Sequence, residues 1–324
     1  MRAWLESRVR MPRRRTCRAA LLALLLIVLA TGCGSDEEGG VADDALEARA
    51  RESAQEARER LEELPQQSEA SEADSLLSSS GAQATNETME QFLTRVIQSV
   101  DPFWTRNLTG AGLAENEVLY RWLAPGESAT TKCTNASGQP ETTTDRTAAY
   151  CQADDTIYFS QQFAVDLWNG TADAELPGAS EGYGKSVGDF AVAYVVAHEY
   201  AHSVQHQLGL YKAIYARYPN AIVQDRPFEL QADCMAGMWA NSVYHQGLLE
   251  AGDVEEALDA ALAVGDFGFT ERGFHGTPEE RHTAWKLGYD TGNAAECNRY
   301  LNPENISVAQ PEDAGGGVVI IGGG

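Results

Sequence analysis

Apolar residues recur at helical spacing in several segments of this 324-residue chain. Over residues 89–100 they fall three and four positions apart, which predicts an amphipathic helix that ends before Pro102. A second helix is predicted over residues 187–208, and Gly209 directly after it is typical of helix C-termini. The first half of this helix is apolar nearly all round, so we expect it to be buried in the core.

Three more helices are predicted toward the C-terminal end. One begins near Pro227, because the fixed φ of proline suits the first helical turn. Another covers residues 253–264, and its first residue forms a predicted capping box with Glu256. The third of these covers residues 277–289, begins with Thr-Pro, and has Glu280 at the position that closes a second capping box. A final short helix is expected to carry Cys297.

Strand-like segments are fewer than helices. Residues 118–123 and 156–160 are rich in β-branched and aromatic side chains, which predicts two short strands, the second followed by a helix over residues 161–168. Residues 133–151 are rich in Thr, Ser and Gly, which predicts a loop. Residues 170–188 carry five glycines, and we expect a long irregular connection there at the rim of a cleft.

The first 32 residues have the pattern of a signal peptide. Arginines crowd positions 8–18, and the apolar run over residues 19–30 is too short to span a bilayer comfortably. The sequence that ends in Thr-Gly-Cys33 is similar to a bacterial lipoprotein processing site, although Ala30 is less usual there than leucine. We expect Cys33 to be acylated and the protein to be anchored to the outer face of the cytoplasmic membrane. An uncleaved N-terminal anchor, the alternative, would leave it on the same side.

Three regions follow this leader. Residues 33–86 form an acidic tether, in which residues 43–64 are predicted to be helical and residues 66–86 to be disordered. Heptad-like spacing in the helical part leaves a short coiled-coil stalk open as an alternative to a solvated spacer. We expect a folded domain over residues 87–303 and a flexible tail over residues 304–324.

The amino-acid composition limits the classes of partner that the protein can bind. Apolar residues make up 43% of the chain, enough for a substantial core, and the formal net charge is −24. Such a protein lacks the surplus of Lys and Arg that phosphate binding needs, so we expect no nucleic-acid partner. Loss of the leader, with its seven Arg and one Glu, would bring the charge to about −30, which suits a domain held off an anionic membrane.

The number of cysteines is consistent with an exported protein. Cys17 lies in the leader and Cys33 is the predicted lipidation site. Four remain in the body of the chain: Cys133, Cys151, Cys234 and Cys297. An even number in an exported chain favours two disulfides, for which three connectivities exist. We favour Cys133–Cys151, which closes a polar loop, and Cys234–Cys297, which ties two late helices together. A structural zinc site is disfavoured because the chain has no Cys-x-x-Cys pair.

The buried helix contains His198-Glu-Tyr-Ala-His202. Histidines four positions apart lie on one helical face, so two imidazoles can bind one metal ion while Glu199 lies on a neighbouring face. This is the H-E-x-x-H pattern, in which the histidines bind zinc and the glutamate is a general base. The alternative is a helix whose histidines merely satisfy polar neighbours. His206 would sit about 12 Å along the axis from His198 and is not expected to be a ligand.

A catalytic zinc needs three protein ligands and one open position. Metzincins place a third histidine six residues after the second, and Leu208 at that position excludes that class. Glu229 and Asp233 have the E-x-x-x-D spacing of gluzincins, in which the glutamate is the third ligand and the aspartate hydrogen-bonds a metal-binding histidine. An ordinary acidic helix face is the alternative, but this helix is largely apolar, and two buried carboxylates are costly without a cation.

Three segments together resemble the bacterial putative neutral zinc metallopeptidase family. They are residues 196–205, 229–239 and 275–281, and residues 150–158 and 288–297 are similar to that family too. The resemblance covers about residues 88–300 and excludes the leader, the tether and the tail.

This resemblance implies a zincin-type α+β fold, mostly helical with a small sheet, one zinc ion, and placement at the membrane or outside the cytoplasm. Ala201 and Glu280 stand where the family often has Gly and where Gln is expected. Neither residue is an expected ligand, so the zinc site stays as predicted.

A mechanism follows from these residues. Zinc held by His198, His202 and Glu229 would lower the pKa of its water and polarise the scissile carbonyl. Glu199 would take the proton of the water and pass it to the leaving amine. We therefore predict a zinc endopeptidase that acts on protein or peptide substrates. An inactive zinc-containing scaffold or binding lipoprotein is the alternative, and hydrolysis of a non-peptide amide also stays open.

The group that stabilises the oxyanion is harder to predict. His275, just before a well-capped helix, is our candidate, ahead of His282 and Tyr200. The strand over residues 156–160 is expected to lie along the cleft and to pair with an extended peptide. The sequence predicts neither the substrate nor the oligomeric state.

Overall fold

The computed structural model describes residues 87–309, except Ala136 and Asn220. The predicted signal peptide, the lipidation site at Cys33 and the tether lie outside the described residues, as does the tail beyond residue 309. Within the described part of the chain, no helix is both long enough and apolar enough to cross a membrane.

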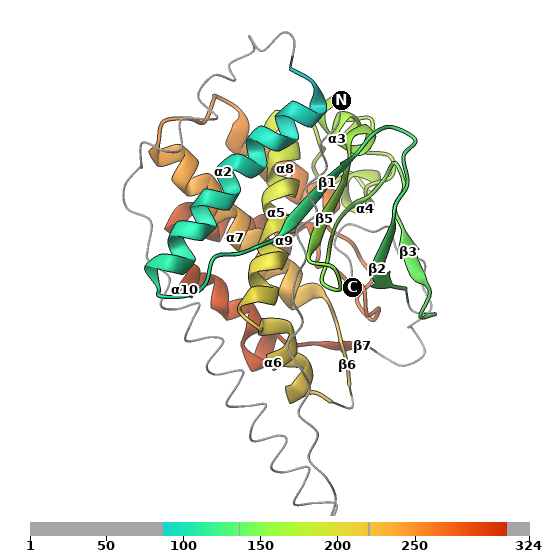
Figure 1. Ribbon diagram of the computed structural model, residues 1–324, viewed down its shortest axis with the longest axis vertical. Helices are drawn as coiled ribbons and strands as arrows, with labels where there is room; N and C mark the ends of the chain where they lie inside the picture. Colours follow the sequence, from blue (N-terminus) through green and yellow to red (C-terminus); the bar gives the residue numbers. More distant parts are fainter. Residues whose placement is uncertain (1–86, 136, 220, 310–324) are drawn as a thin grey trace, which may run out of the picture.

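Helices make up most of the regular structure (Figure 1). The longer ones are α2 (Met89–Gly110), α3 (Gln161–Asn169), α5 (Asp189–Gln207), α6 (Leu210–Arg217), α7 (Arg226–His245), α8 (Asp253–Val264) and α9 (Pro278–Thr291). The short ones are α4 (Pro177–Ser180), α10 (Ala294–Cys297) and the 3-10 turns η2 (Asn298–Leu301) and η3 (Pro303–Asn305). With three small sheets they form the mixed, helix-rich architecture that was expected.

The sheets are small, and two of their four described strand pairings join segments far apart in the sequence. The largest has the strand order β1-β5-β4, in which β5 runs parallel to β1 and antiparallel to β4. The second sheet is the β2–β3 hairpin, and the third pairs β6 with β7. The strands are β1 (Leu119–Leu123), β2 (Thr130–Thr134), β3 (Pro140–Thr142), β4 (Ala148–Cys151), β5 (Thr156–Ser160), β6 (Ile222–Val223) and β7 (Val308–Ala309).

Two segments predicted to be irregular contain regular structure. The prediction of a loop over residues 133–151 is wrong, because this Thr-rich stretch includes β3 and β4 and the end of β2. The Cys133–Cys151 disulfide, one of the two pairings favoured above, ties the hairpin to β4 with its Cα atoms 5.7 Å apart. The glycine-rich connection over residues 170–188 contains helix α4, which packs on α8.

Strand β5 lies in the middle of its sheet. It is buried along its whole length, as expected for a strand covered on both faces, and both its edges are paired. The prediction that residues 156–160 pair with a peptide is therefore wrong, because no edge of β5 is free. Strands β1 and β4 are the two edge strands of this sheet, and each pairs only with β5 among the described strands.

Helix α5 lies at the centre of the molecule, as its apolar pattern predicts. It packs against α2, α7, α8 and β4 (Figure 1). Every residue from Phe190 to Gln205 is buried, including the polar ones. Side chains on such a helix have little freedom to change rotamer, so α5 is a rigid support for a functional site.

Helix α2 extends past Pro102, so the prediction that it ends there is wrong. Phe103, Trp104 and Leu108 continue its buried face beyond the proline. Their burial in the core offsets the hydrogen bond that proline removes from a helix interior.

The start of α8 also differs from the prediction. Gly252 is its N-cap, and no capping box forms. Asp253 instead accepts a hydrogen bond from the Glu250 N–H, and Glu256 accepts one from the Phe190 N–H, in the first turn of α5. A tertiary contact thus takes the carboxylate that a local capping box would use. In α9 the predicted capping box is present.

Helices α7 and α9 approach each other unusually closely. A Cβ atom at Gly237 would stand 2.1 Å from the Trp285 carbonyl oxygen, and one at Gly288 would stand 1.8 Å from the Cys234 carbonyl oxygen. Glycine at both positions therefore permits backbone contact. The Cys234–Cys297 disulfide, the second favoured pairing, joins α7 to α10 next to this contact.

This close contact generates a stability prediction. Gly288→Ala should lower the free energy of unfolding by about 2 kcal/mol or more, because the added methyl group overlaps the α7 backbone. Alanine is otherwise the better helix former, so a loss of stability would have the opposite sign to the propensity effect. Urea unfolding measures the change, with Thr283→Ala on the exposed face of α9 as control. Equal or greater stability of Gly288→Ala would contradict the close packing.

Candidate metal centre

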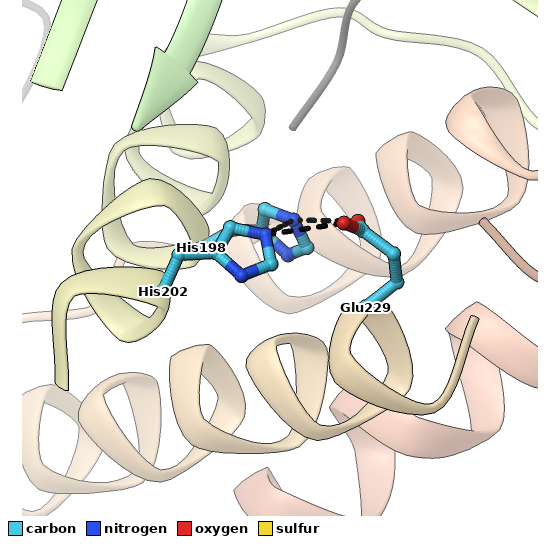
Figure 2. Close-up of side chains that lie close together, drawn as sticks. All are labelled: His198, His202 and Glu229. Carbon is cyan, nitrogen blue, oxygen red and sulfur yellow. Dashed lines mark hydrogen bonds and ion pairs between the residues drawn. The ribbon is translucent and has the colours of Figure 1, made fainter. Parts of the chain in front are cut away.

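Two helices bring the three predicted ligands together. His198 and His202 come from α5 and Glu229 from α7, and all three side chains are buried. The two Nε2 atoms are 3.1 Å apart, and the Glu229 carboxylate oxygens lie 3.1 Å from Nε2 of His198 and 3.3 Å from Nε2 of His202. Figure 2 shows the three side chains converging on one point between the helices.

These separations fit a tetrahedral zinc ion. Ligand atoms about 2.1 Å from such an ion stand about 3.4 Å from one another, close to the distances found here. The hydrogen bonds of the two imidazoles also fit a metal ion at this position. Nδ1 of His198 lies 2.9 Å from the Asp233 carboxylate, and Nδ1 of His202 lies 2.9 Å from the Gln205 carbonyl oxygen, so each Nδ1 donates a proton. When both rings are neutral, the two Nε2 lone pairs face each other, and a metal cation between them would stabilise this arrangement.

Charge balance leads to the same conclusion. Glu199, Glu229 and Asp233 are buried within one region, and Arg281 is the buried guanidinium beside them. With neutral imidazoles, three carboxylates and one guanidinium leave two negative charges, which a divalent cation would offset. Burial lowers the pKa of His198, but Asp233 outweighs burial and raises it to about 9, so a protonated His198 would also offset part of this charge. Burial opposes ionisation of Glu229, but His202 and His198 hold its pKa well below its usual range.

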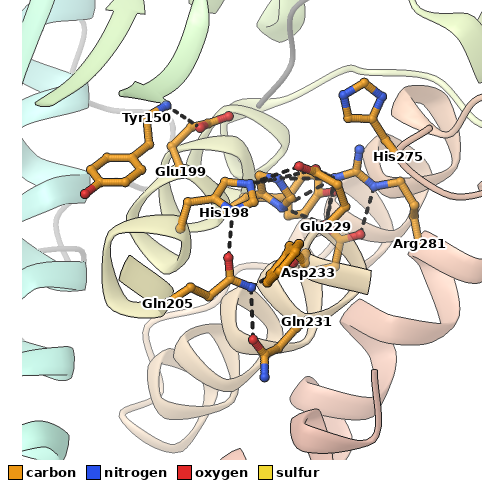
Figure 3. Close-up of polar contacts among 12 residues, drawn as sticks. Tyr150, His198, Glu199, Gln205, Glu229, Gln231, Asp233, His275 and Arg281 are labelled. Atoms are coloured by element: carbon orange, nitrogen blue, oxygen red, sulfur yellow. Dashed lines mark hydrogen bonds and ion pairs between the residues drawn. The ribbon is translucent and has the colours of Figure 1, made fainter. Parts of the chain in front are cut away.

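Asp233 links the His198 ligand to α9. Its carboxylate accepts hydrogen bonds from the Tyr194 hydroxyl at 2.7 Å and from Arg281 at 2.8 and 2.9 Å (Figure 3). Burial raises the pKa of Asp233, but Arg281 and His198 outweigh burial and hold it below the usual value. An ionised Asp233 fixes the orientation of the His198 ring and strengthens its donation to a metal.

A separate set of polar side chains orients His202. The hydroxyl of Tyr211, on α6, donates to the side-chain amide oxygen Oε1 of Gln205 at 2.8 Å. It lies equally close to Nδ1 of His202. Gln205 in turn donates to the Phe228 carbonyl oxygen and to Gln231 on α7 (Figure 3). Both imidazoles are therefore held from the side opposite the metal position.

Glu199 projects toward the sheet rather than toward α7. One carboxylate oxygen accepts a hydrogen bond from the Tyr150 N–H in β4 at 2.8 Å, and the other is buried without a hydrogen-bond partner among the described residues. Burial raises the pKa of Glu199, against the opposing effect of the two histidines. A carboxylate with one free oxygen and a raised pKa can accept and release a proton.

His275 lies on the loop between α8 and α9, close to Arg281 in the view of Figure 3. It is buried, and its Nδ1 is 2.7 Å from the Asp266 carboxylate. Burial alone would lower the pKa of His275, but the hydrogen bond to Asp266 outweighs it, so the pKa lies above the usual value. The other ring nitrogen remains available for a ligand.

The remaining histidine and tyrosine candidates have other roles. His206 is exposed, and its Nδ1 lies 2.7 Å from the Tyr150 hydroxyl, so it is not part of the ligand group. Tyr200 donates its hydroxyl to Asp101 on α2 and is not part of the ligand group. His282 is half-buried on α9 and belongs to no cluster of metal-binding side chains in the described residues.

Four residues that support the ligands were not predicted from the sequence: Arg281, Tyr194, Gln205 and Tyr211. Arg281 carried a usable signal, because it shares a helical face with the apolar residues Ala284 and Trp285 three and four positions later. An arginine on an apolar face needs a buried anion. The other three carried no such signal, because their roles depend on which helices meet.

Comparison with known proteins agrees with this site. A family model described as putative neutral zinc metallopeptidase matches residues 55–300, and so begins within the segment assigned to the tether. No solved structure matches the chain.

Relatives are found in distant bacteria. The chain is 38% identical over 165 residues to the uncharacterized protein YpfJ of Escherichia coli strain K12, which covers 47% of this chain and 53% of that protein. It is 34% identical over 170 residues to the uncharacterized protein Rv2575 of Mycobacterium tuberculosis strain H37Rv, which covers 47% of this chain and 54% of that protein. The chain thus spans about half the length of the curated relatives it matches. Because the family model covers most of its length, this chain belongs to the putative neutral zinc metallopeptidase family.

Proposed function

We propose that this protein is a zinc-dependent endopeptidase that hydrolyses peptide bonds outside the cytoplasmic membrane. The observation that carries the proposal is the position of Glu199, a buried carboxylate with a free oxygen next to a three-ligand site. A purely structural zinc has four protein ligands and no use for such a base. No fourth metal-binding side chain joins the group among the described residues.

The residues divide the chemistry between them. When bound, zinc would lower the pKa of a water molecule toward neutrality and polarise the scissile carbonyl. Glu199 takes a proton from the attacking water and later gives it to the leaving amine. Its hydrogen bond to the Tyr150 N–H keeps the carboxylate at the boundary between α5 and β4, where water and peptide would meet.

His275 is our candidate for stabilising the negative charge that develops on the carbonyl oxygen. Asp266 holds Nδ1, favours the protonated ring, and leaves the second nitrogen to donate to the oxyanion. The partner of the substrate backbone is the edge strand β4 rather than β5, because β4 carries the residue that contacts Glu199.

The location outside the cytoplasm is part of the proposal. It rests on the leader of residues 1–32, on the predicted acylation of Cys33, and on the two disulfides. Disulfides persist in oxidising compartments and are rare in the bacterial cytoplasm, so they support export independently of the leader.

The central prediction concerns Glu199. Glu199→Gln should keep zinc bound, because residue 199 is not a ligand, and should lower kcat at least about 10²-fold, because an amide cannot carry the proton. Hydrolysis of internally quenched peptides with both ends blocked measures endopeptidase activity, and metal analysis measures zinc. Glu279→Gln, on the exposed surface of α9, is the control. Wild-type activity in Glu199→Gln would contradict this mechanism.

A second prediction concerns Asp233. Asp233→Asn should lower zinc affinity about 10–100-fold, because the His198 ring loses its carboxylate acceptor. Tyr194→Phe should have a smaller effect, since it removes only one hydrogen bond to the same carboxylate. Competition with a chromophoric chelator measures affinity, and circular dichroism checks folding. Unchanged affinity in a folded Asp233→Asn protein would argue against this support of the ligand.

A third prediction tests His275. His275→Ala should lower kcat about 10²-fold with little change in zinc content, because one donor to the oxyanion is lost. His245→Ala, at an exposed position at the end of α7, should be neutral. If both variants retain wild-type kcat, another group must stabilise the oxyanion.

A further inference from the structure

Three exposed aromatic side chains lie together beside the loop that carries His275. They are Tyr183, which is 37% exposed, Phe267 at 39% and Phe269 at 60%. The ring centroids of Tyr183 and Phe267 are 5.6 Å apart, and those of Phe267 and Phe269 are 6.4 Å apart. We call these three residues the aromatic strip. Phe269 also contacts the buried ring of Phe274 at 5.3 Å, and Phe274 directly precedes His275. One end of the strip therefore adjoins the candidate for stabilising the oxyanion.

Hydrogen bonds fix the loop that carries two members of the strip. At the base of the loop, the Asp266 carboxylate accepts a hydrogen bond from the His275 N–H at 3.1 Å. Farther along, the Gln224 side chain donates to the carbonyl oxygens of Phe269 and Glu271 at 2.9 and 2.8 Å. A loop that is anchored at both places holds its aromatic side chains at the surface. Their exposure is thus a property of the fold.

The third member, Tyr183, comes from the connection between α4 and α5. This connection packs closely on α8, because a Cβ atom at Gly184 would stand 2.2 Å from the Asp259 carbonyl oxygen. A Cβ atom at Gly178 would likewise stand 2.1 Å from the Leu262 carbonyl oxygen. Glycine at both positions permits this approach. Both segments that form the strip are therefore held by α8, one packed against it and the other beginning at its C-terminal end.

The strip has the properties of a surface that binds an apolar group. Contiguous exposed apolar side chains mark interaction sites, and aromatic rings supply a large contact area with few rotatable bonds. Each of the two segments, residues 181–188 and 267–273, carries one exposed acidic and one exposed basic residue. These are Glu181 with Lys185 and Glu271 with Arg272. The charge on the segments therefore selects neither sign, and apolar contact dominates recognition there.

The position of the strip favours a substrate side chain as its occupant. A peptide whose scissile carbonyl lies between the metal position and His275 would continue along the loop that His275 shares with Phe269. The 5.3 Å between the rings of Phe274 and Phe269 is a distance that one or two residues of extended peptide cover, at about 3.3 Å each. An anionic membrane is disfavoured as the occupant, because the chain has a formal charge of −24 and neither segment has a surplus of Lys and Arg.

We propose that the aromatic strip binds a large apolar side chain of the substrate. The side chain would lie against the rings of Phe267 and Phe269, with Tyr183 at its far end. This inference rests on the proposed endopeptidase function and adds a substrate class to it. The expected preference is for Phe or Leu at one fixed position near the scissile bond, with tolerance of size because the strip is an open surface.

The test uses matched blocked peptides. Cleavage of a peptide library by the zinc-loaded protein would first locate the position of strongest preference, and peptides with Phe, Leu, Ala or Lys at that position would then be compared. Wild-type protein should favour Phe or Leu over Ala in kcat/KM by about tenfold, because apolar surface is buried on binding. The ratio should hold or rise as sodium sulfate is added, because this salt strengthens apolar contacts and screens charges.

Variants at exposed positions separate the strip from the rest of the site. Phe269→Ala should lower the Phe-to-Ala ratio toward one, whereas Phe269→Leu should keep most of it, because leucine preserves the apolar contact. Phe267→Ala should act in the same direction as Phe269→Ala. Tyr244→Ala, the control, removes a ring that is 56% exposed at the end of α7 and should keep the wild-type ratio. Hydrolysis of the Ala peptide verifies that each variant is folded and active.

The outcomes distinguish the two proposals. If wild-type protein cleaves peptides without preferring Phe or Leu, or if Phe269→Ala keeps that preference, the assignment of the strip is overturned and the endopeptidase function stands. Vesicles of phosphatidylcholine and phosphatidylglycerol test the other occupant. If Phe269→Ala weakens binding to them and leaves peptide selectivity unchanged, the strip contacts membrane and the assignment is wrong. If the zinc-loaded wild-type protein cleaves no peptide in the library, the proposed function fails, and the substrate class fails with it.

Discussion

The structure depends on the compensation of charge buried between α5 and α7. Glu199, Glu229 and Asp233 would each be costly to bury alone, and Arg281 balances only one of them. The Nε2 atoms of His198 and His202 lie near the same point as the Glu229 carboxylate. A divalent cation at that point would compensate the remaining carboxylate charge, so the proposed active site is part of the core of this protein.

The rest of the fold holds these buried groups in place, and β4 borders them on one side. Glycines at the α7–α9 contact let Arg281 reach Asp233, and the Cys234–Cys297 disulfide joins α7 to α10 beside this contact. On the other side, β4 holds Glu199 by a backbone hydrogen bond and is an edge strand of its sheet.

Much of the fold and of the candidate site was predictable from the sequence, because the relevant signals are local. The H-E-x-x-H spacing, the four-residue separation of Glu229 and Asp233, and the apolar pattern of α5 each depend on a single helix. The errors arose where distant contacts overrode local rules. Core packing carries α2 through Pro102, Glu256 caps α5 instead of its own helix, and β4 takes the edge that was assigned to β5.

Local sequence patterns predicted most of the long helices, the metal-binding residue types and the resemblance to the family, since periodicity and motif spacing are properties of short segments. They favoured the two observed disulfide pairings without excluding the other connectivities. Only the tertiary structure decided which groups surround the ligands. Arg281 is 83 residues from His198 along the chain, and Tyr150 is 49 residues from Glu199. No local pattern specifies contacts across such separations, because they depend on how helices and strands pack.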